Sequence, residues 1–168
     1  MQKIIIIGIS AIGKTWFSKE LSKKLGLPVF HLDTIFWKDN WEEQDPEIVK
    51  NKISELLSQD SYIIEGYIEP LSNERIKKAD TIIYLDFSGY VAFFQAIKRW
   101  FKHRQVSRPE LPQNNIESLG FKFFMTILFR KERDEIEKAI KGYSEKVIRL
   151  KNKKEAHEFL VSLDGGTY

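Results

Sequence analysis

Short apolar runs alternate along the chain with longer segments in which apolar residues recur every three or four positions. The first run, Ile4–Ile7, consists of consecutive isoleucines, which is typical of a strand covered on both faces of a parallel sheet. Further apolar runs predict strands over residues 29–32, 62–65, 81–86 and 146–150. The pattern therefore predicts a sheet of five short strands.

The segments between these runs have helical periodicity and recognisable ends. Thr15 begins a predicted helix that Gly26 and Pro28 end, and Asp45 is expected to cap a helix that starts at Pro46. The predicted helices cover residues 15–25, 46–57, 89–102, 116–141 and 153–163. Strands that alternate with helices predict an α/β fold, in which right-handed crossovers place helices on both faces of a parallel sheet.

Length and composition narrow the class of protein further. The 168 residues fit a single domain, 1–168, and 42% hydrophobic with 30% charged residues excludes a disordered or fibrous chain. The absence of cysteine excludes a disulfide scaffold, a thiolate zinc site and a cysteine nucleophile, and it agrees with a cytoplasmic location. No secretory signal or membrane span is predicted, and the net charge of +3 is too small to indicate nucleic-acid binding.

The strongest functional motif directly follows the first predicted strand. Residues Gly8–Thr15 fit the phosphate-binding pattern G-x-x-x-x-G-K-[ST] in the strand-to-helix context that it requires. Successive N–H groups would form an anion cradle, Lys14 would supply charge to the β- and γ-phosphates of ATP, and the Thr15 hydroxyl would bind Mg²⁺. The residues expected to hold the nucleotide here are Gly8, Ile9, Ser10, Ala11, Ile12, Gly13, Lys14, Thr15 and Trp16.

The same glycines also have the spacing of a dinucleotide-binding loop. Gly8 and Gly13 match the outer positions of G-x-G-x-x-G, and Asp33 lies 20 residues beyond Gly13. However, Ser10 replaces the middle glycine, and Lys14 has no role in that scheme. The residues therefore favour the phosphate loop over a dinucleotide oxidoreductase.

Acidic residues end three of the predicted strands, at the edge where open parallel sheets bind ligands. Asp33 is expected to orient or deprotonate an acceptor hydroxyl, although an aspartate here would also suit a helix cap over residues 34–37. Glu65 is placed where an acid holds a Mg²⁺-bound water, or is simply solvated. Asp86 is expected to have a structural role.

Basic residues are concentrated between the fourth and fifth predicted strands. An arginine on a mobile segment can close over a transferring phosphoryl group, and Pro109 and Pro112 favour an irregular flap, so residues 103–115 are expected to form a lid. A run of this kind can also be an ordinary solvated face. The basic residues concerned are Lys98, Arg99, Lys102, His103, Arg104, Arg108, Arg130, Lys131 and Arg133.

Aromatic residues and histidines give weaker signals. Trp37, Trp41 and Tyr67 lie near the expected mouth of the site, where they either line an acceptor pocket or cover the sheet. The histidines are scattered along the chain without the spacing of metal ligands, so no histidine metal site is predicted.

Together these motifs resemble the adenylate-kinase-like P-loop kinases, and within them the DNA topology modulation (FlaR-like) proteins. The resemblance spans nearly the whole chain, through residues 8–15, 29–37, 62–66, 79–86, the basic segment and 146–150. It implies a three-layer P-loop fold with a five-stranded parallel sheet in the order 2-3-1-4-5 and a small lid. It also implies lid arginines, to which Arg99, Arg104 and Arg108 correspond, and an acceptor-side arginine, to which Arg75 corresponds. The resemblance further implies a base-contacting loop at Asn152 and Lys153.

The chain departs from the family pattern at particular positions. Ala11 and Ile12 stand where small residues or glycine are usual, which reduces the freedom of the phosphate loop. The sequence Glu65-Gly66-Tyr67 replaces a more familiar Asp-Gly-Asn-Tyr, and the turn at 87–89 lacks an arginine that often follows there.

The residues and the resemblance predict a kinase that binds ATP and Mg²⁺ and transfers the γ-phosphoryl group to a nucleotide or other small-molecule acceptor near Asp33. In this interpretation Lys14, Asp33, Arg99, Arg104 and Arg108 carry catalysis, and Thr15 with Glu65 holds the metal. The alternative is a regulatory protein of the DNA topology modulation type that hydrolyses ATP slowly and acts through a partner or DNA. The sequence does not identify the acceptor.

Overall fold

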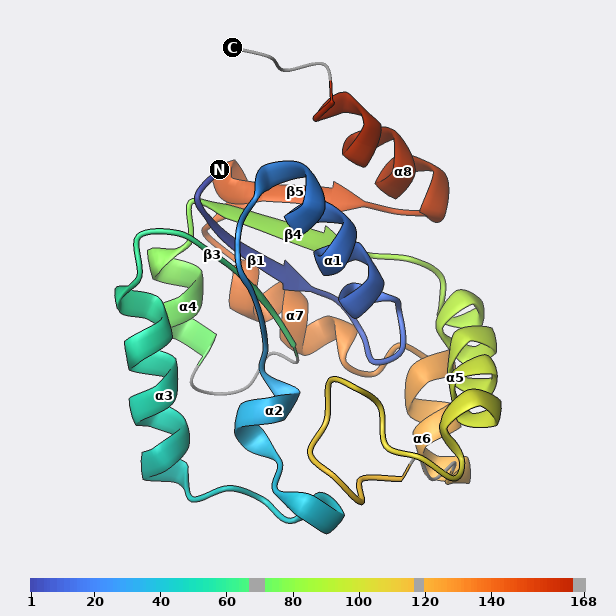
Figure 1. Cartoon of the computed structure of the whole chain (residues 1–168). Coiled ribbons are helices and arrows are strands. Elements are labelled where there is room, and N and C mark those ends of the chain that lie inside the picture. Colours follow the sequence, from blue (N-terminus) through green and yellow to red (C-terminus); the bar gives the residue numbers. More distant parts are fainter. Residues whose placement is uncertain (67–71, 117–119, 165–168) are drawn as a thin grey trace.

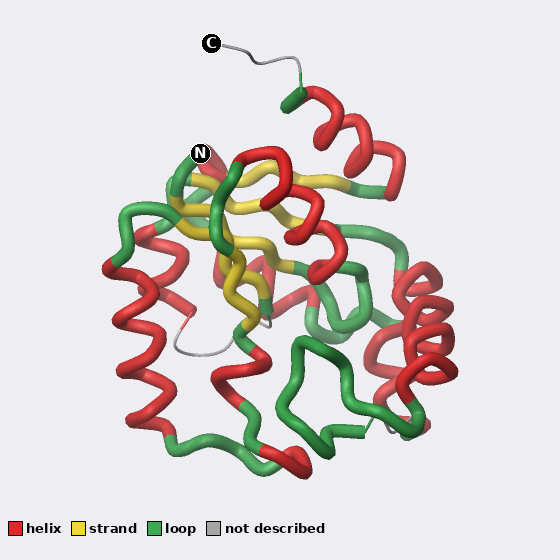
Figure 2. Tube along the Cα trace, in the orientation of Figure 1, coloured by secondary structure: helices red, strands yellow, loops and turns green. Residues whose placement is uncertain are grey.

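The computed structural model describes residues 1–66, 72–116 and 120–164. Its centre is a five-stranded parallel sheet in the order β2-β3-β1-β4-β5, which confirms the predicted fold class and strand order. Figure 1 and Figure 2 show helices arranged around this sheet. The strands are β1 (Lys3–Ile7), β2 (Val29–His31), β3 (Tyr62–Glu65), β4 (Thr81–Leu85) and β5 (Val147–Leu150).

The central strand is β1, which pairs with β3 on one side and β4 on the other. Its residues Ile4–Ile7 are at most 1% exposed, as expected for a strand covered on both faces. The sheet thus places the carboxyl ends of β1, β2 and β3 next to one another, and these ends carry the predicted phosphate loop and two of the predicted acids.

Helices pack on both faces of the sheet. Helices α1 and α8 contact each other, as do α4 and α7, while α5 packs along α6 beyond the ends of the strands (Figure 1). None of the helices in the described part of the chain is long and apolar enough to cross a membrane. The helices are α1 (Lys14–Leu25), α2 (Asp33–Phe36), α3 (Pro46–Ser58), α4 (Ser72–Lys78), α5 (Gly89–His103), α6 (Phe121–Leu128), α7 (Arg133–Ile140) and α8 (Lys153–Ser162), with short 3₁₀ turns η1 (Asp39–Trp41) and η2 (Ser144–Lys146).

Local capping signals in the sequence were read correctly. The Asp45 carboxylate accepts a hydrogen bond of 2.8 Å from the backbone N–H of Glu47, and Pro46 is the first residue of α3. Gly26 ends α1 in the left-handed conformation, with φ of 68°. The short helix α2 lies where the alternative interpretation of Asp33 placed a capped segment, residues 34–37, and the helix α4 was not predicted.

The prediction of one helix over residues 116–141 is wrong. A turn at residues 129–132 separates α6 from α7, and Arg130 adopts a left-handed φ of 53° there. The turn is held by ion pairs from Arg130 and Arg133 to Asp86, whose side chain is only 8% exposed and which also pairs with Arg149. A helical pattern in the sequence does not report ion pairs with a residue as distant as Asp86. These ion pairs give Asp86 the structural role that was expected for it.

Candidate active site

The phosphate loop connects β1 to α1 and depends on its two glycines. A Cβ at Gly8 would lie 2.8 Å from the carbonyl oxygen of Leu85, so only glycine fits against the neighbouring strand. Gly13 has a φ of 102°, a conformation that side chains rarely adopt. The N-terminus of α1 therefore opens directly into the loop, as the motif requires.

Ala11 adopts the left-handed conformation in which glycine is usual. Its φ is 59°, which costs roughly 1–2 kcal/mol for a residue with a Cβ. The loop thus keeps the path that its motif requires, and the reduced backbone freedom expected from the sequence results in strain at Ala11.

Lys14 is folded back onto its own loop. Its Nζ donates hydrogen bonds to the carbonyl oxygens of Gly8, at 2.9 Å, and Ile9, at 3.1 Å. Burial lowers the pKa of Lys14, and the nearby carboxylates of Glu65 and Glu132 oppose this shift in part. A cation is therefore held at the centre of the loop, within reach of any anion that binds there.

Glu132 reaches the phosphate loop from the turn between α6 and α7. Its two carboxylate oxygens accept hydrogen bonds from the Ser10 backbone N–H, at 2.6 Å, and from the Ser10 hydroxyl, at 2.8 Å. The carboxylate thus occupies donors of the predicted anion cradle. This contact was not predictable from the sequence, because Glu132 lies within a basic run 122 positions away from Ser10.

Thr15, at the start of α1, forms a partly buried polar cluster with Glu65 and His31, which end β3 and β2. The Thr15 hydroxyl donates to Glu65 Oε1 at 2.9 Å, and His31 Nδ1 lies 2.6 Å from the same oxygen. Burial alone would raise the pKa of Glu65, but the hydrogen bonds from His31 and Thr15 and the charge of Lys14 hold that pKa below its ordinary value. Glu65 is 6% exposed, so it is not the solvated strand-end residue that the sequence also allowed.

The residues at this cluster fit Mg²⁺, although the described residues contain no group of three or more acidic or histidine side chains arranged around a common metal position. A hydroxyl and an ionised carboxylate lie side by side next to the phosphate loop. Mg²⁺ in kinase sites is held by one or two such oxygens together with substrate phosphates and water, so a full protein cage is not needed.

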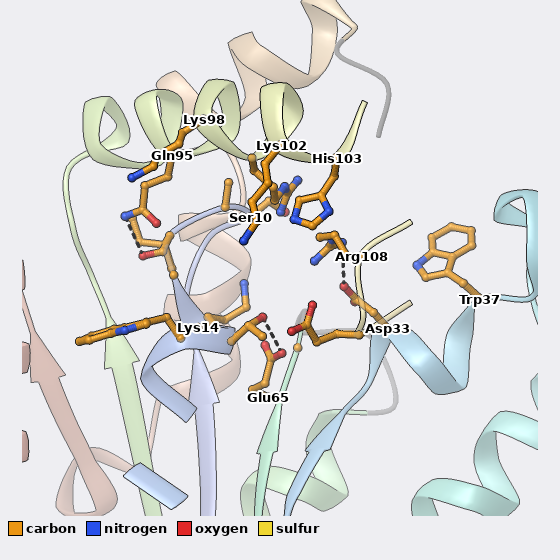
Figure 3. Close-up of a pocket in the computed structure, with 18 of the residues that line it drawn as sticks. Ser10, Lys14, Asp33, Trp37, Glu65, Gln95, Lys98, Lys102, His103 and Arg108 are labelled. Carbon is orange, nitrogen blue, oxygen red and sulfur yellow. Dashed lines mark hydrogen bonds and ion pairs between the residues drawn. The ribbon is translucent and has the colours of Figure 1, made fainter. Parts of the chain in front are cut away.

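Asp33 is the first residue of α2 and faces the phosphate loop across the cavity. Leu32 rather than Asp33 is the N-cap residue of α2, and Asp33 Oδ2 lies 3.6 Å from Nη2 of Arg108. Figure 3 shows Asp33, Arg108 and Trp37 at one end of the pocket, with Lys14 and Glu65 between them and Gln95. The ion pair brings the predicted base and one predicted lid arginine together.

A cavity of about 780 Å³ joins these groups. The phosphate loop and α1 form one wall, α5 contributes a row of cations, and the segment after β2 contributes aromatic rings (Figure 3). Predicted site residues that line it are Ser10, Ala11, Ile12, Gly13, Lys14, Thr15, Trp16, Asp33, Trp37, Trp41, Glu65, Lys98, Arg99, Lys102, His103 and Arg108.

Other predicted residues lie elsewhere. Arg104 is exposed, and its guanidinium lies 6.0 Å from the ring centre of Trp100. Asn152 caps α8 by accepting from the Glu155 N–H at 2.9 Å, and Lys153 is the first residue of that helix. Arg75 is buried on α4, at 2% exposure. The predicted position Tyr67 lies outside the described residues.

The predicted phosphate loop thus follows the central strand of a parallel sheet in the order β2-β3-β1-β4-β5. No protein-family model matches the chain. The shikimate kinase of Bacillus cytotoxicus is 28% identical over an alignment of 171 residues, which covers 90% of this chain and 99% of that protein.

Solved kinases share the fold. The shikimate kinase of Acinetobacter baumannii, solved in complex with shikimate, superposes with a TM-score of 0.59 over 97% of this chain and 90% of that chain, at 18% identity. A gluconokinase of Sinorhizobium meliloti superposes with a TM-score of 0.58 over 96% and 93% of the two chains, at 14% identity.

Sequence motif, fold and relatives agree on the class of enzyme. They support a phosphotransferase that moves a phosphoryl group from ATP to a small-molecule acceptor, as the sequence predicted. Kinases of this type use ATP and typically Mg²⁺. The dinucleotide oxidoreductase is excluded by the same agreement.

Proposed function

We propose that this kinase phosphorylates a hydroxyl group of a small acceptor bound between Asp33 and the phosphate loop. The observation that carries the proposal is the position of the Asp33–Arg108 pair, which lines the same cavity as Lys14 and the Thr15–Glu65 cluster. The similarity to shikimate kinases supports a small hydroxylated acceptor, because those enzymes act on shikimate.

The reaction uses these residues in distinct roles. The acceptor oxygen attacks the γ-phosphorus of ATP, the bond from that phosphorus to the bridging oxygen of ADP breaks, and the hydroxyl proton passes to the Asp33 carboxylate. Lys14 and Arg108, with Arg99 from α5, stabilise the charge that develops on the transferred group. Thr15 and Glu65 would hold Mg²⁺, which neutralises phosphate charge when it is bound.

A panel of acceptors tests the proposal directly. ADP release would be measured with ATP and Mg²⁺ in the presence of sugars, sugar acids including shikimate and gluconate, nucleosides and nucleoside monophosphates. We expect at least one acceptor to raise ADP release well above the rate with ATP alone. An unstimulated rate with every acceptor, combined with DNA binding that weakens steeply with salt, would favour the regulatory alternative.

Some expectations from the sequence stay predictions. The finer resemblance to DNA topology modulation (FlaR-like) proteins is not carried by the relatives described above, which are sugar-acid and shikimate kinases. Base contacts from Asn152 and Lys153, the catalytic role of Arg104 and the cytoplasmic location are likewise predictions. The segment 103–115 is proposed as the lid because it carries Arg108 into the cavity.

Replacing Arg108 with alanine should lower turnover by roughly 10-fold or more with little change in ATP affinity, because charge-assisted bonds strengthen once water leaves the closed site. Arg104→Ala should have a smaller effect, since the Arg104 side chain lies against Trp100. Steady-state kinetics and ATP titration measure both, and hydrogen exchange over residues 103–115 with a bisubstrate analogue reports closure. Normal turnover of Arg108→Ala with unchanged exchange would contradict a lid.

Replacing Glu132 with glutamine should tighten ATP binding by roughly 5-fold, because a charged hydrogen-bond acceptor that competes with phosphate for Ser10 is lost. The Glu132 carboxylate occupies Ser10 donors in the free loop, and its charge opposes a polyphosphate there. Calorimetric titration with a non-hydrolysable ATP analogue measures the change. Asp134→Asn, at an exposed acid in the first turn of α7, is the matched control. Weaker binding by Glu132→Gln would show instead that Glu132 braces the loop for nucleotide.

A further inference from the structure

The segment after α2 folds back on itself and presents two indole rings to the cavity. The Lys38 N–H donates to the Glu42 carbonyl at 2.7 Å, and Trp37 and Glu43 form an antiparallel bridge. Trp37 and Trp41 pack edge to face, with ring centres 5.5 Å apart, and both line the cavity beside Asp33. We call residues 36–44 the acceptor loop.

The acceptor loop is strained at the residue that carries one of these rings. Asn40 and Trp41 both have a φ of 59°, and a bulky residue such as tryptophan rarely adopts this conformation. Backbone strain of this kind persists only where the surroundings fix it, and it is concentrated at functional sites. The position of the Trp41 ring is therefore specified by contacts outside the loop.

Those contacts come from the end of the proposed lid. Asn115 is fully buried; its side-chain oxygen accepts from the Trp41 N–H at 2.6 Å, and its amide donates to the Lys38 carbonyl at 2.9 Å. The Trp41 indole N–H donates to the Ile116 carbonyl at 2.9 Å. Because Asn115 bonds to the acceptor loop through both of its polar atoms, the two rings are held in place before any acceptor binds.

Two pairs of opposite charges lie at this end of the cavity, where Lys102 and His103 of α5 also line the wall (Figure 3). Arg108 pairs with Asp33, and Lys19 of α1 pairs with Glu110 of the lid segment. An anionic group on an acceptor would have to displace an acid from its cation, whereas hydroxyl groups can bond to both members of a pair. Cations from α5, including Lys98, line the wall beside the phosphate loop, where a polyphosphate needs them (Figure 3).

We propose that the acceptor is an uncharged, hydroxylated ring compound whose apolar ring face packs on Trp37 and Trp41 while one hydroxyl meets Asp33. Aromatic side chains bind such faces because the ring buries apolar area and leaves its hydroxyl groups free at the edge. Neutral sugars, cyclitols and nucleosides share this chemistry. The inference rests on the proposed function for the identity of the reacting hydroxyl, but the binding surface does not depend on catalysis.

Binding measured without ATP tests the surface by itself. Calorimetric titrations would compare neutral and anionic members of matched pairs, glucose with glucuronate and adenosine with AMP, together with inositol and shikimate. We expect at least one neutral ring compound to bind roughly 10-fold or more tightly than its anionic counterpart, as repulsion from displaced acids requires. Comparison of the sugar titrations with the nucleoside titrations identifies which class of neutral ring compound binds. Tighter binding of the anionic members, or no binding by any neutral ring, overturns the proposal.

Variants locate the binding surface. With the neutral ligand that binds, Trp37→Ala should weaken binding by roughly 10-fold or more, and Trp37→Phe should restore much of it, since stacking needs an aromatic face. Trp100→Phe is the matched control, because Trp100 lies on α5 against Phe101. Equal binding by Trp37→Ala and wild type overturns the proposal.

Asn115→Ala tests the positioning role. It should raise KM for the acceptor much more than it lowers kcat, because the rings lose their fixed position while Asp33 remains. If neutral rings bind but none is phosphorylated, the binding surface stands and the proposed kinase reaction at this site fails. Unchanged KM in Asn115→Ala would show that Asn115 does not position the rings.

Discussion

Lys14→Ala should reduce kcat/KM for ATP by roughly 10-fold or more, because we propose that Lys14 supplies positive charge to the β- and γ-phosphates. In the structure its Nζ donates to the Gly8 and Ile9 carbonyls, so it must exchange these bonds for phosphate oxygens when ATP binds. Steady-state kinetics with the acceptor found in the panel measure the loss.

The fold should tolerate this change. Lys14→Ala removes two hydrogen bonds, but it also removes the cost of holding an ammonium group in a buried setting, so we expect the free energy of unfolding to change by about 1 kcal/mol or less. Lys23→Ala, on the exposed face of the same helix, is the control for helix effects. Equal ATP binding and turnover in Lys14→Ala and wild type would exclude the loop as the phosphate site.

The fold was predictable because its signals are local. Four consecutive isoleucines specify a strand buried on both faces, and Gly13 and Lys14 follow it at the spacing of a phosphate loop, so the position of the site in the sheet follows from a few adjacent residues. The cap at Asp45 was likewise predictable, since a capping side chain bonds only two positions away.

The contacts that shape the site were not predictable because they join residues far apart in the chain. Glu132 bonds to Ser10 across 122 positions, and Asn115 bonds to Trp41 across 74. Nothing in a periodic pattern identifies a single acid in a basic run, or an asparagine after a proline-rich turn, as such a partner. His31 had a signal that was overlooked, because it lies two positions before Asp33 at the same strand end.

The boundary between α6 and α7 shows the same limit. Residues 116–141 have a helical pattern, yet residues 129–132 form a turn in which Arg130 and the adjoining Arg133 pair with the buried Asp86. That turn is also what brings Glu132 to the phosphate loop. Because the turn was not predicted, the contact of Glu132 with Ser10 was not predicted either.

Asp33→Asn should impair phosphoryl transfer far more than ATP binding. The amide keeps the size of the carboxylate and can still accept a hydrogen bond from Arg108, but it cannot take the proton of the acceptor hydroxyl. Loss of a general base costs roughly 10²–10⁴-fold in rate, so we expect kcat to fall by about that much while ATP affinity stays within roughly 2-fold.

The competing interpretation is that Asp33 only anchors Arg108, with which it forms an ion pair. An anchor that loses its charge would free the arginine, so Asp33→Asn and Arg108→Ala would then have similar effects, and the double variant would be no worse than either. A base acts on a different atom from the arginine, so Asp33→Asn should be the more severe of the two. Asp39→Asn, at an exposed acid of the acceptor loop, controls for charge alone. Normal transfer by Asp33→Asn at every acceptor concentration would leave Asp33 as a partner of Arg108 and would require another group to accept the proton.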